Sequence, residues 1–246
     1  MPELKAAVFD LGGTLCEWYD GLVPEIMLAS VAPAAIALLP PTQAARLSPE
    51  AVGRAVRQAY LVVEEASCEG DRSPVPVELV VQNALRSFDL DIDAETARAF
   101  LAALYIPESR TTRLLPGAVE TLHSLVERGL RLGIISNRMH GGTLLLDDLG
   151  YFGISHYFSS VIASCDAGYM KPHPTLFLRA LDDLGVLPEE AVMVGDDLRA
   201  DIRGSLAVGM HAVWMRRPPT RTDEPPVGVP SMTQLSQLPR LIAQLE

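Results

Sequence analysis

The chain contains few lysines and few cysteines. Of its 20 basic residues only Lys5 and Lys171 are lysines, which makes Lys171 a marked position. The three cysteines, Cys16, Cys68 and Cys165, are an odd number without the spacing of a metal site. This pattern predicts reduced thiols in a cytoplasmic protein rather than a disulfide framework.

Long hydrophobic runs and a positive net charge are also absent. The longest apolar run, around residues 31–39, is interrupted by Pro33 and is too short to cross a bilayer. The N-terminus has neither the basic start nor the apolar run of a signal peptide. The net charge of −11 argues against nucleic acid as a partner. It is compatible with a small phosphorylated substrate, because a local site can differ in sign from the whole surface.

The pattern of apolar residues divides the 246 residues into two parts. Residues 16–112 have only helical spacing, whereas after Pro116 short apolar strands alternate with helices. Such alternation is typical of a parallel sheet with right-handed crossovers. We expect an α/β, Rossmann-like core of residues 1–15 and 113–246, with residues 16–112 as an all-helical insert.

Periodicity and capping residues place the expected elements along the chain. In the insert, we expect helices at 22–39, from Ser48, at 75–87 and from Asp93, and a polar loop at 67–74. In the core, we expect strands at 6–9, 131–135, 161–164, 191–194 and 211–215. Core helices are expected at 118–128, 141–149, 174–184 and 232–245, the last one after a Pro-rich loop at 216–230.

Four segments that end in polar residues carry the candidate chemistry. Asp10 follows the first apolar strand, Ser136 follows the second, Asp196 follows a later one, and Lys171 lies in a loop before a helix. The carboxyl ends of parallel strands share one edge of the sheet, where ligands of open α/β folds bind. We therefore expect these side chains to converge. Taken singly, each has a plainer interpretation, since Asp10 can cap a turn and Ser136 can simply end a strand.

The same residues carry a resemblance to a known family. In order, the chain has Asp-X-X-Gly-Thr from Asp10, a serine at 136, Lys171-Pro172, and Gly-Asp-Asp-Leu-Arg-Ala-Asp ending at Asp201. This order and spacing resemble the haloacid dehalogenase superfamily of hydrolases over nearly the whole chain. The resemblance implies a Rossmann-like core with a mobile helical cap and a Mg²⁺-dependent hydrolase that acts on a small phosphorylated metabolite.

The resemblance also implies a role for each motif residue. Asp10 would be the nucleophile that attacks phosphorus and forms an aspartyl-phosphate. Mg²⁺ would be bound by the carboxylates of Asp10 and Asp196 and the carbonyl of Gly12, with Asp201 binding or orienting a metal-bound water. Lys171 would keep Asp10 ionised and balance phosphate charge. The phosphate would be held by Leu11, Gly12, Gly13, Ser136, Asn137 and Lys171.

Two acids of the fourth motif have more than one interpretation. Asp197 either supports the metal ligands from behind or caps the helix that follows it. Asp201 either lies at the metal or is an exposed helix residue. The sequence pattern leaves both alternatives open.

The sequence departs from the family pattern at position 12. Phosphatases of the family usually carry an Asp two residues after the nucleophile, which protonates the leaving group, and here that residue is Gly12. Acid–base catalysis typically contributes about 10²–10⁴-fold. Activity is therefore expected to be weak or limited to good leaving groups, unless Glu17, Tyr19 or Asp20 replaces the acid. A non-catalytic or regulatory phosphate-binding protein is the alternative, and a dehalogenase is disfavoured because the fourth motif is typical of metal binding.

Overall fold

The computed structural model describes residues 3–19, 24–68, 76–107, 110–217 and 224–245. The chain forms two compact units, which we call the core unit and the helical unit. The core unit comprises Met1–Glu17 and Thr112–Glu246, and the helical unit comprises Trp18–Thr111. The division thus falls after Glu17 and after Thr111, where the sequence analysis placed it after residues 15 and 112.

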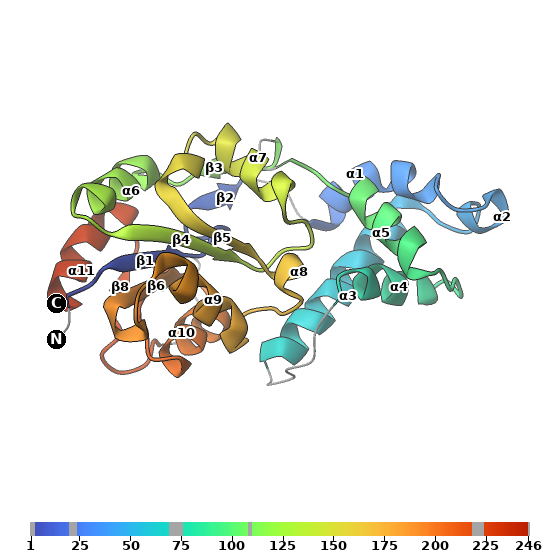
Figure 1. Cartoon of the computed structure of the whole chain (residues 1–246). Helices are drawn as coiled ribbons and strands as arrows, with labels where there is room; N and C mark the ends of the chain where they lie inside the picture. The colour runs from blue at the N-terminus through green and yellow to red at the C-terminus, as the bar shows by residue number, and fades with distance from the viewer. Residues whose placement is uncertain (1–2, 20–23, 69–75, 108–109, 218–223, 246) are drawn as a thin grey trace. The chain divides into compact units, whose positions relative to one another are not determined.

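The core unit is built on a six-stranded parallel sheet (Figure 1). Its strand order is β5-β4-β1-β6-β7-β8. The strands are β1 (Ala6–Phe9), β4 (Arg131–Ser136), β5 (Phe158–Ala163), β6 (Ala191–Gly195), β7 (His211–Met215) and β8 (Ser231–Met232). β1 and β6 are buried along their whole length, which is why their sequences read as continuous apolar runs rather than as alternating ones.

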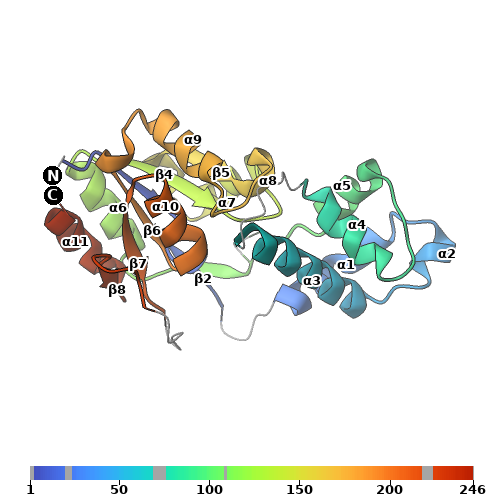
Figure 2. The same ribbon diagram turned by 90° about the horizontal axis from the view of Figure 1, so that it is seen from below.

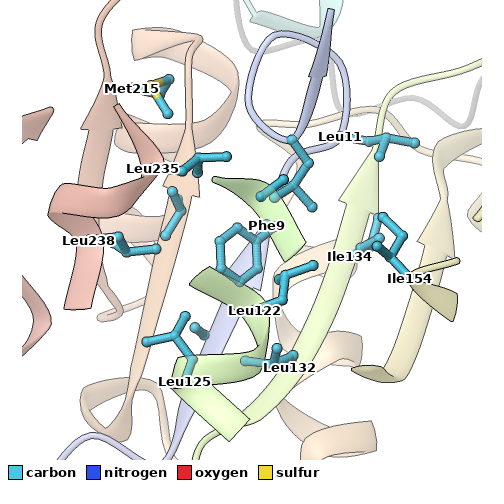
Figure 3. Packing of buried hydrophobic residues seen from close by; sticks show 14 of the residues in the cluster. Phe9, Leu11, Leu122, Leu125, Leu132, Ile134, Ile154, Met215, Leu235 and Leu238 are labelled. Atoms are coloured by element: carbon cyan, nitrogen blue, oxygen red, sulfur yellow. The ribbon is translucent and has the colours of Figure 1, made fainter. Parts of the chain in front are cut away.

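Helices cover both faces of this sheet (Figures 1 and 2). On one face, Phe9 packs in a cluster with residues of α6 (Ala118–Glu127), α7 (Thr143–Tyr151) and α11 (Leu238–Leu245). Figure 3 shows the Phe9 ring beside Leu122 of α6 in this cluster. On the other face, Val8 packs with residues of α9 (Pro174–Leu184). The two faces of β1 are thus both covered, which fixes the strand in the centre of a three-layer α/β/α unit.

Helix α9 shows how the local sequence specifies an element. Its apolar residues form one buried face against the sheet: Leu176, Phe177, Ala180, Leu181 and Leu184. The helix begins with Pro174 in its first turn, and Nδ1 of His173 accepts a hydrogen bond from the backbone N–H of Thr175. It ends at Gly185 in the left-handed conformation. The loop that carries Lys171 therefore leads into a helix with a well-defined start.

Several elements of the core unit differ from the expected ones. β5 begins at Phe158 rather than at residue 161, and a short helix, α8 (Ser164–Ala167), follows it. The last helix begins only at Leu238, because Ser231–Met232 pairs with β7 as the edge strand β8. Two short strands, β2 (Cys16–Trp18) and β3 (Thr112–Leu114), form a second sheet at the boundaries of the units. Among the described residues, the core unit also contains the short helices η2 (Ser155–Tyr157), η3 (Pro188–Glu190), η4 (Leu198–Arg203), α10 (Gly204–Ala207) and η5 (Leu235–Gln237).

The helical unit contains five helices among its described residues: α1 (Pro24–Ile36), α2 (Pro41–Ala44), α3 (Pro49–Cys68), α4 (Glu78–Arg86) and α5 (Ala94–Ala103). Its buried residues include Ala32, Val56 and Phe100. A Cβ at Gly53 would overlap the backbone of α1, so the glycine permits the close approach of α1 and α3. Most of the expected polar loop, from residue 69 on, lies outside the described residues.

None of the helices in the described residues has both the length and the hydrophobicity needed to cross a membrane.

Candidate active site

The candidate site lies at the carboxyl edge of the sheet, where β1 ends between β4 and β6. Phe9 pairs with Ile134 of β4 and with Val194 of β6, and the backbone N–H of Asp10 donates to the carbonyl of Val194 at 2.9 Å. The chain passes from β1 to its two neighbours in opposite directions, which makes this edge the topological switch point. The pairing thus brings Asp10, Ser136 of β4 and Asp196 after β6 to one place.

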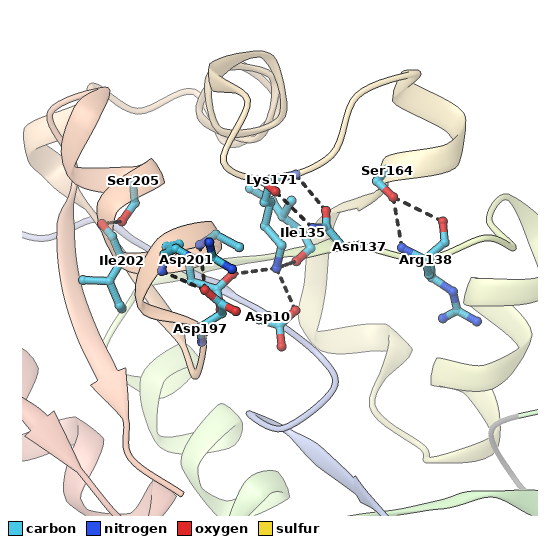
Figure 4. Close-up of polar contacts among 12 residues, drawn as sticks. Asp10, Ile135, Asn137, Arg138, Ser164, Lys171, Asp197, Asp201, Ile202 and Ser205 are labelled. Atoms are coloured by element: carbon cyan, nitrogen blue, oxygen red, sulfur yellow. Dashed lines mark hydrogen bonds and ion pairs between the residues drawn. The ribbon is translucent and has the colours of Figure 1, made fainter. Parts of the chain in front are cut away.

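Lys171 contacts two of the acids (Figure 4). Its Nζ lies 2.7 Å from Oδ1 of Asp10 and 2.7 Å from Oδ1 of Asp201, and it donates to the carbonyl of Ile135 at 2.9 Å. The side chain is 2% exposed. Burial opposes the charged form, but the neighbouring carboxylates of Asp10 and Asp201 outweigh it and raise the pKa of Lys171. The ammonium is therefore charged at neutral pH.

Three carboxylates gather around this ammonium. Asp10, Asp196 and Asp201 each offer an oxygen atom, and these atoms lie within 4.8 Å of one another. Burial and the charges of Asp10 and Asp201 raise the pKa of Asp196. One ammonium leaves negative charge in excess among three acids, and a divalent cation would balance it. Oxygen ligands at this density suit Mg²⁺, so the residues fit the metal that the sequence implies.

The side chain of Asn137 forms two hydrogen bonds with the backbone of Lys171. Its Oδ1 accepts from the backbone N–H of Lys171 at 2.7 Å, and its Nδ2 donates to the carbonyl of the same residue at 3.1 Å. These two hydrogen bonds tie the end of β4 to the lysine loop. Phosphate binding by Asn137 stays a prediction. Ser136, the last residue of β4, is buried at the same edge.

The acids of the fourth motif have distinct contacts. Oδ1 of Asp197 accepts from the backbone N–H groups of Arg199 and Ala200, so Asp197 is the N-cap of η4. Asp201 is 1% exposed rather than on the surface, and its Oδ2 accepts from the backbone N–H of Asp197 at 3.0 Å. Burial thus excludes the interpretation of Asp201 as an exposed helix residue. Asp197 caps η4, and its predicted support of the metal ligands stays a prediction.

The turn after Asp10 is held by hydrogen bonds within its own backbone. The N–H of Gly13 donates to the carbonyl of Cys16 at 2.7 Å. Gly13 has a φ of +86°, and a Cβ there would overlap the Asp196 carboxylate, so only glycine fits. Because this N–H is used within the turn, the expected contribution of Gly13 to phosphate binding does not come from it. Leu11 and Gly12 stay predicted to bind phosphate through their backbone N–H groups.

Residues 4–209 match the family model of the haloacid dehalogenase-like hydrolases. The chain belongs to this family. Its relatives include a phosphoserine phosphatase of Thermus thermophilus, 40% identical over 117 residues, and a glyceraldehyde 3-phosphate phosphatase of Methanopyrus kandleri, 35% identical over 141 residues. The matched segments cover 48% and 57% of this chain, and 46% and 60% of those relatives, which is less than two thirds of either.

Solved structures of the family have the same fold. A phosphatase from Thermococcus onnurineus aligns with a TM-score of 0.62 and 26% identity, covering 97% of this chain and 98% of its own. A 2-haloacid dehalogenase from Pseudomonas syringae aligns with a TM-score of 0.64 and 25% identity, covering 99% of this chain and 100% of its own. The fold thus occurs with both chemistries, and the residues of the site have to distinguish between them.

Open space surrounds the Cα atom of Gly12 in this haloacid dehalogenase-like hydrolase. A Cβ placed on Gly12 would meet no atom within 4 Å, apart from its chain neighbours. The φ of Gly12 lies outside the left-handed region, so other residues can adopt it. Sterics and backbone conformation therefore both permit a larger side chain where the family usually has an acid.

The three substitutes considered for the missing acid differ in their surroundings. Glu17 is paired with Arg113 at 3.0 Å and with Arg217 at 2.6 Å. Burial opposes its ionisation, but the hydrogen bonds from these arginines outweigh it and lower the pKa of Glu17. The hydrolase therefore holds Glu17 as a carboxylate at neutral pH, without a proton to donate. Tyr19 belongs to the helical unit and is 40% exposed, and Asp20 lies outside the described residues.

Residues outside the sequence motifs also make contacts at the site, and the sequence did not predict them. Nε1 of Trp214, on β7, donates to the backbone carbonyl of Asp196 at 2.9 Å. It thereby fixes the backbone of a predicted metal ligand of the hydrolase. A single tryptophan in an apolar strand gives no signal of this role, because only the pairing of β6 with β7 brings the two residues together.

Proposed function

We propose that this chain is a Mg²⁺-dependent phosphatase that hydrolyses a small phosphorylated metabolite through Asp10. The contact of Lys171 with both Asp10 and Asp201, within a cluster of three carboxylates, carries the proposal. A buried ammonium in contact with the nucleophile offers positive charge to an incoming phosphate. The phosphatases among the relatives support this class of substrate.

The proposed reaction has two steps. A carboxylate oxygen of Asp10 attacks phosphorus, and the bond to the leaving oxygen breaks with its electron pair on that oxygen. A water oxygen then attacks the phosphorus of the aspartyl-phosphate and loses a proton to solvent. The bond to Asp10 breaks with its electron pair on the carboxylate, which releases inorganic phosphate. Mg²⁺, when bound by Asp10, Asp196, Asp201 and the Gly12 carbonyl, would supply positive charge near the phosphoryl oxygens.

Other residues of the chain position the phosphoryl group. Lys171 lies against Asp10 and would balance the charge of a phosphoryl oxygen as the bond forms. Ser136 is at the same edge and would donate its hydroxyl, together with the backbone N–H groups of Leu11 and Gly12. Asn137, also predicted to bind phosphate, would in addition hold the backbone of Lys171.

The leaving group sets the limit of this activity. Gly12 has no proton to donate, and Glu17 is held as a carboxylate by two arginines. The leaving oxygen then departs as an anion or takes its proton from solvent. The rate therefore lacks the factor of about 10²–10⁴ that a general acid typically contributes. We therefore propose that substrates with good leaving groups, such as acyl or aryl phosphates, are hydrolysed faster than alkyl phosphates.

Two other functions have some support. The glycine at position 12 favours a non-catalytic or regulatory protein that binds phosphate and metal without turnover. The similarity to a solved 2-haloacid dehalogenase favours attack on carbon. The carboxylate cluster argues against the latter, because attack on carbon requires no cation to balance Asp196 and Asp201. Intact Asp10 and Lys171 argue against the former.

One assay distinguishes the three functions. Purified chain would be incubated with p-nitrophenyl phosphate and Mg²⁺, with EDTA as the metal control and Asp10→Asn as the nucleophile control. A parallel incubation with 2-chloropropionate would report halide release. We expect Mg²⁺-dependent nitrophenol release by the wild type alone. Turnover no greater than that of Asp10→Asn contradicts the phosphatase, and halide release would identify a dehalogenase.

A further inference from the structure

Arg217 reaches back to the turn that follows the nucleophile. It lies just after β7, yet its Nη1 donates to the carbonyl of Gly13 at 3.0 Å and its Nη2 to Oε2 of Glu17 at 2.6 Å. These partners precede it by 204 and 200 positions. The Arg217 side chain is 30% exposed and therefore largely covered. One guanidinium thus connects the segment after β7 to Gly13 and Glu17, the two ends of the short loop at residues 13–17.

Both backbone polar groups of Gly13 are consequently in use. Its N–H donates to the carbonyl of Cys16 at 2.7 Å, and its carbonyl accepts from Arg217 at 3.0 Å. The N–H of Gly13 belongs to the same planar trans peptide as the carbonyl of Gly12, and the two point in opposite directions. The hydrogen bond from the Gly13 N–H to Cys16 therefore sets the direction of the Gly12 carbonyl. Arg217 holds the next peptide, Gly13–Thr14, through the Gly13 carbonyl.

Glu17 in turn fixes Arg217. Its Oε2 accepts from Arg217, while its Oε1 accepts from Nε of Arg113 at 3.1 Å on β3. A carboxylate bound by two arginines has little freedom to rotate. The planar guanidinium has donors at fixed angles, so it can serve a carbonyl and a carboxylate at once, whereas a lysine ammonium is a single point of charge. The geometry therefore requires an arginine specifically.

We propose that Arg217 is a positioning residue that holds the Gly13–Thr14 peptide and, through the conformation of Gly13, orients the metal-binding carbonyl of Gly12. This inference rests on the proposed function, because the role of the Gly12 carbonyl belongs to it. Groups that orient metal ligands from behind typically contribute about 10–100-fold to metal affinity or activity. Arg217 would act in this way without touching the substrate or the metal.

The test measures Mg²⁺ binding by calorimetry in the absence of substrate, together with kcat and KM for p-nitrophenyl phosphate. Arg217→Ala is expected to weaken Mg²⁺ binding, and to lower kcat/KM at subsaturating Mg²⁺, by about 10–100-fold. The matched control is Arg216→Ala, which removes the same charge from the adjacent, exposed position. Arg217→Lys is expected to recover only part of the loss. Glu17→Gln is expected to change Mg²⁺ affinity in the same direction but less.

The outcomes separate this inference from the proposed function. If Arg217→Ala and Arg216→Ala bind Mg²⁺ with equal affinity, the positioning role of Arg217 is overturned. It is also overturned if the wild-type chain binds no Mg²⁺. If Arg217→Ala does not fold, Glu17→Gln decides, and unchanged Mg²⁺ affinity in that variant overturns it. A wild type that binds Mg²⁺ but releases no phosphate contradicts the phosphatase, while the calorimetric comparison still tests Arg217.

Discussion

The Nζ atom of Lys171 lies 2.7 Å from Oδ1 of Asp10, although 161 positions separate the two residues in the chain. The same atom lies 2.7 Å from Oδ1 of Asp201. The ammonium lies between two buried carboxylates and balances part of their negative charge. The parallel strand order that creates this contact also places Asp10 at the carboxyl edge of the sheet, where ligands of open α/β folds bind.

Replacing Lys171 should remove this charge from the nucleophile. Lys171→Met is expected to lower kcat for p-nitrophenyl phosphate by about 10²–10³-fold, the usual loss when one electrostatic partner of the transition state is removed. Lys5→Met is the matched control, since Lys5 is the other lysine of the chain and pairs with Glu190 on the surface. Exposed pairs contribute only about 0–1 kcal/mol. Equal activities of the two variants would contradict the role of Lys171.

Restoring an acid at position 12 should broaden the substrate range. Gly12→Asp is expected to raise kcat/KM for an alkyl phosphate by up to about 10²–10⁴-fold, because open space surrounds that position. The gain should be smaller for p-nitrophenyl phosphate, whose leaving group needs little protonation. Gly12→Asn is the control with the same shape and no acidic proton. A Gly12→Asp variant no better than Gly12→Asn would show that protonation of the leaving group does not limit the wild type.

Removal of metal should make stability depend on pH. Burial, with Asp10 and Asp201 as neighbours, raises the pKa of Asp196 from 3.8 to about 8 in the folded chain without metal. Between these values the folded state binds more protons than the unfolded state, so stability falls as pH rises. Thermal unfolding in EDTA should therefore show a greater destabilisation at pH 8 than at pH 5, and Mg²⁺ should stabilise more at the higher pH.

The control for this pH dependence is Asp196→Asn, which cannot titrate. Its melting temperature in EDTA should change less between pH 5 and pH 8 than that of the wild type. The same pH dependence in both proteins would mean that other groups cause it. An effect of Mg²⁺ that is equal at both pH values would contradict a metal site formed by the ionised cluster.

The two interpretations of Asp197 predict different results. Its carboxylate caps η4, so Asp197→Ala should lower the free energy of unfolding by about 0.5–2 kcal/mol. Asp197→Asn keeps an oxygen acceptor without the charge, and it should stay close to wild type in both urea denaturation and Mg²⁺ affinity. A loss of Mg²⁺ affinity in Asp197→Asn without loss of stability would show that the charge serves the metal instead.

Sequence alone predicted the fold class because the strands are continuous apolar runs and their polar ends have the same order as a known family. The parallel sheet and the family are both confirmed. The edge strand β8 was missed since Ser231–Met232 is too short to show a period, and pairing with β7 overrides the helical pattern that follows. Tertiary contact, not local preference, decides such elements.

The predicted site residues differ in how far sequence could specify them. Asp10, Asp196 and Lys171 meet at one edge because strand ends converge, and this follows from alternating strands and helices. Sequence could not predict two hydrogen bonds, because both depend on the conformations of loops. One joins Asn137 to the backbone of Lys171, and the other joins the Gly13 N–H to Cys16. Arg217 lies outside every motif, and only the register of β7 brings it near the turn.

The most direct measurement of the central claim is the mass of the peptide containing Asp10 after acid quenching during turnover. The phosphatase mechanism predicts that this peptide gains one phosphoryl group in the wild type with Mg²⁺ and p-nitrophenyl phosphate. It predicts no gain in Asp10→Asn. A wild type that releases phosphate while Asp10→Asn is equally active, or a phosphoryl group found on another residue, would contradict Asp10 as the nucleophile.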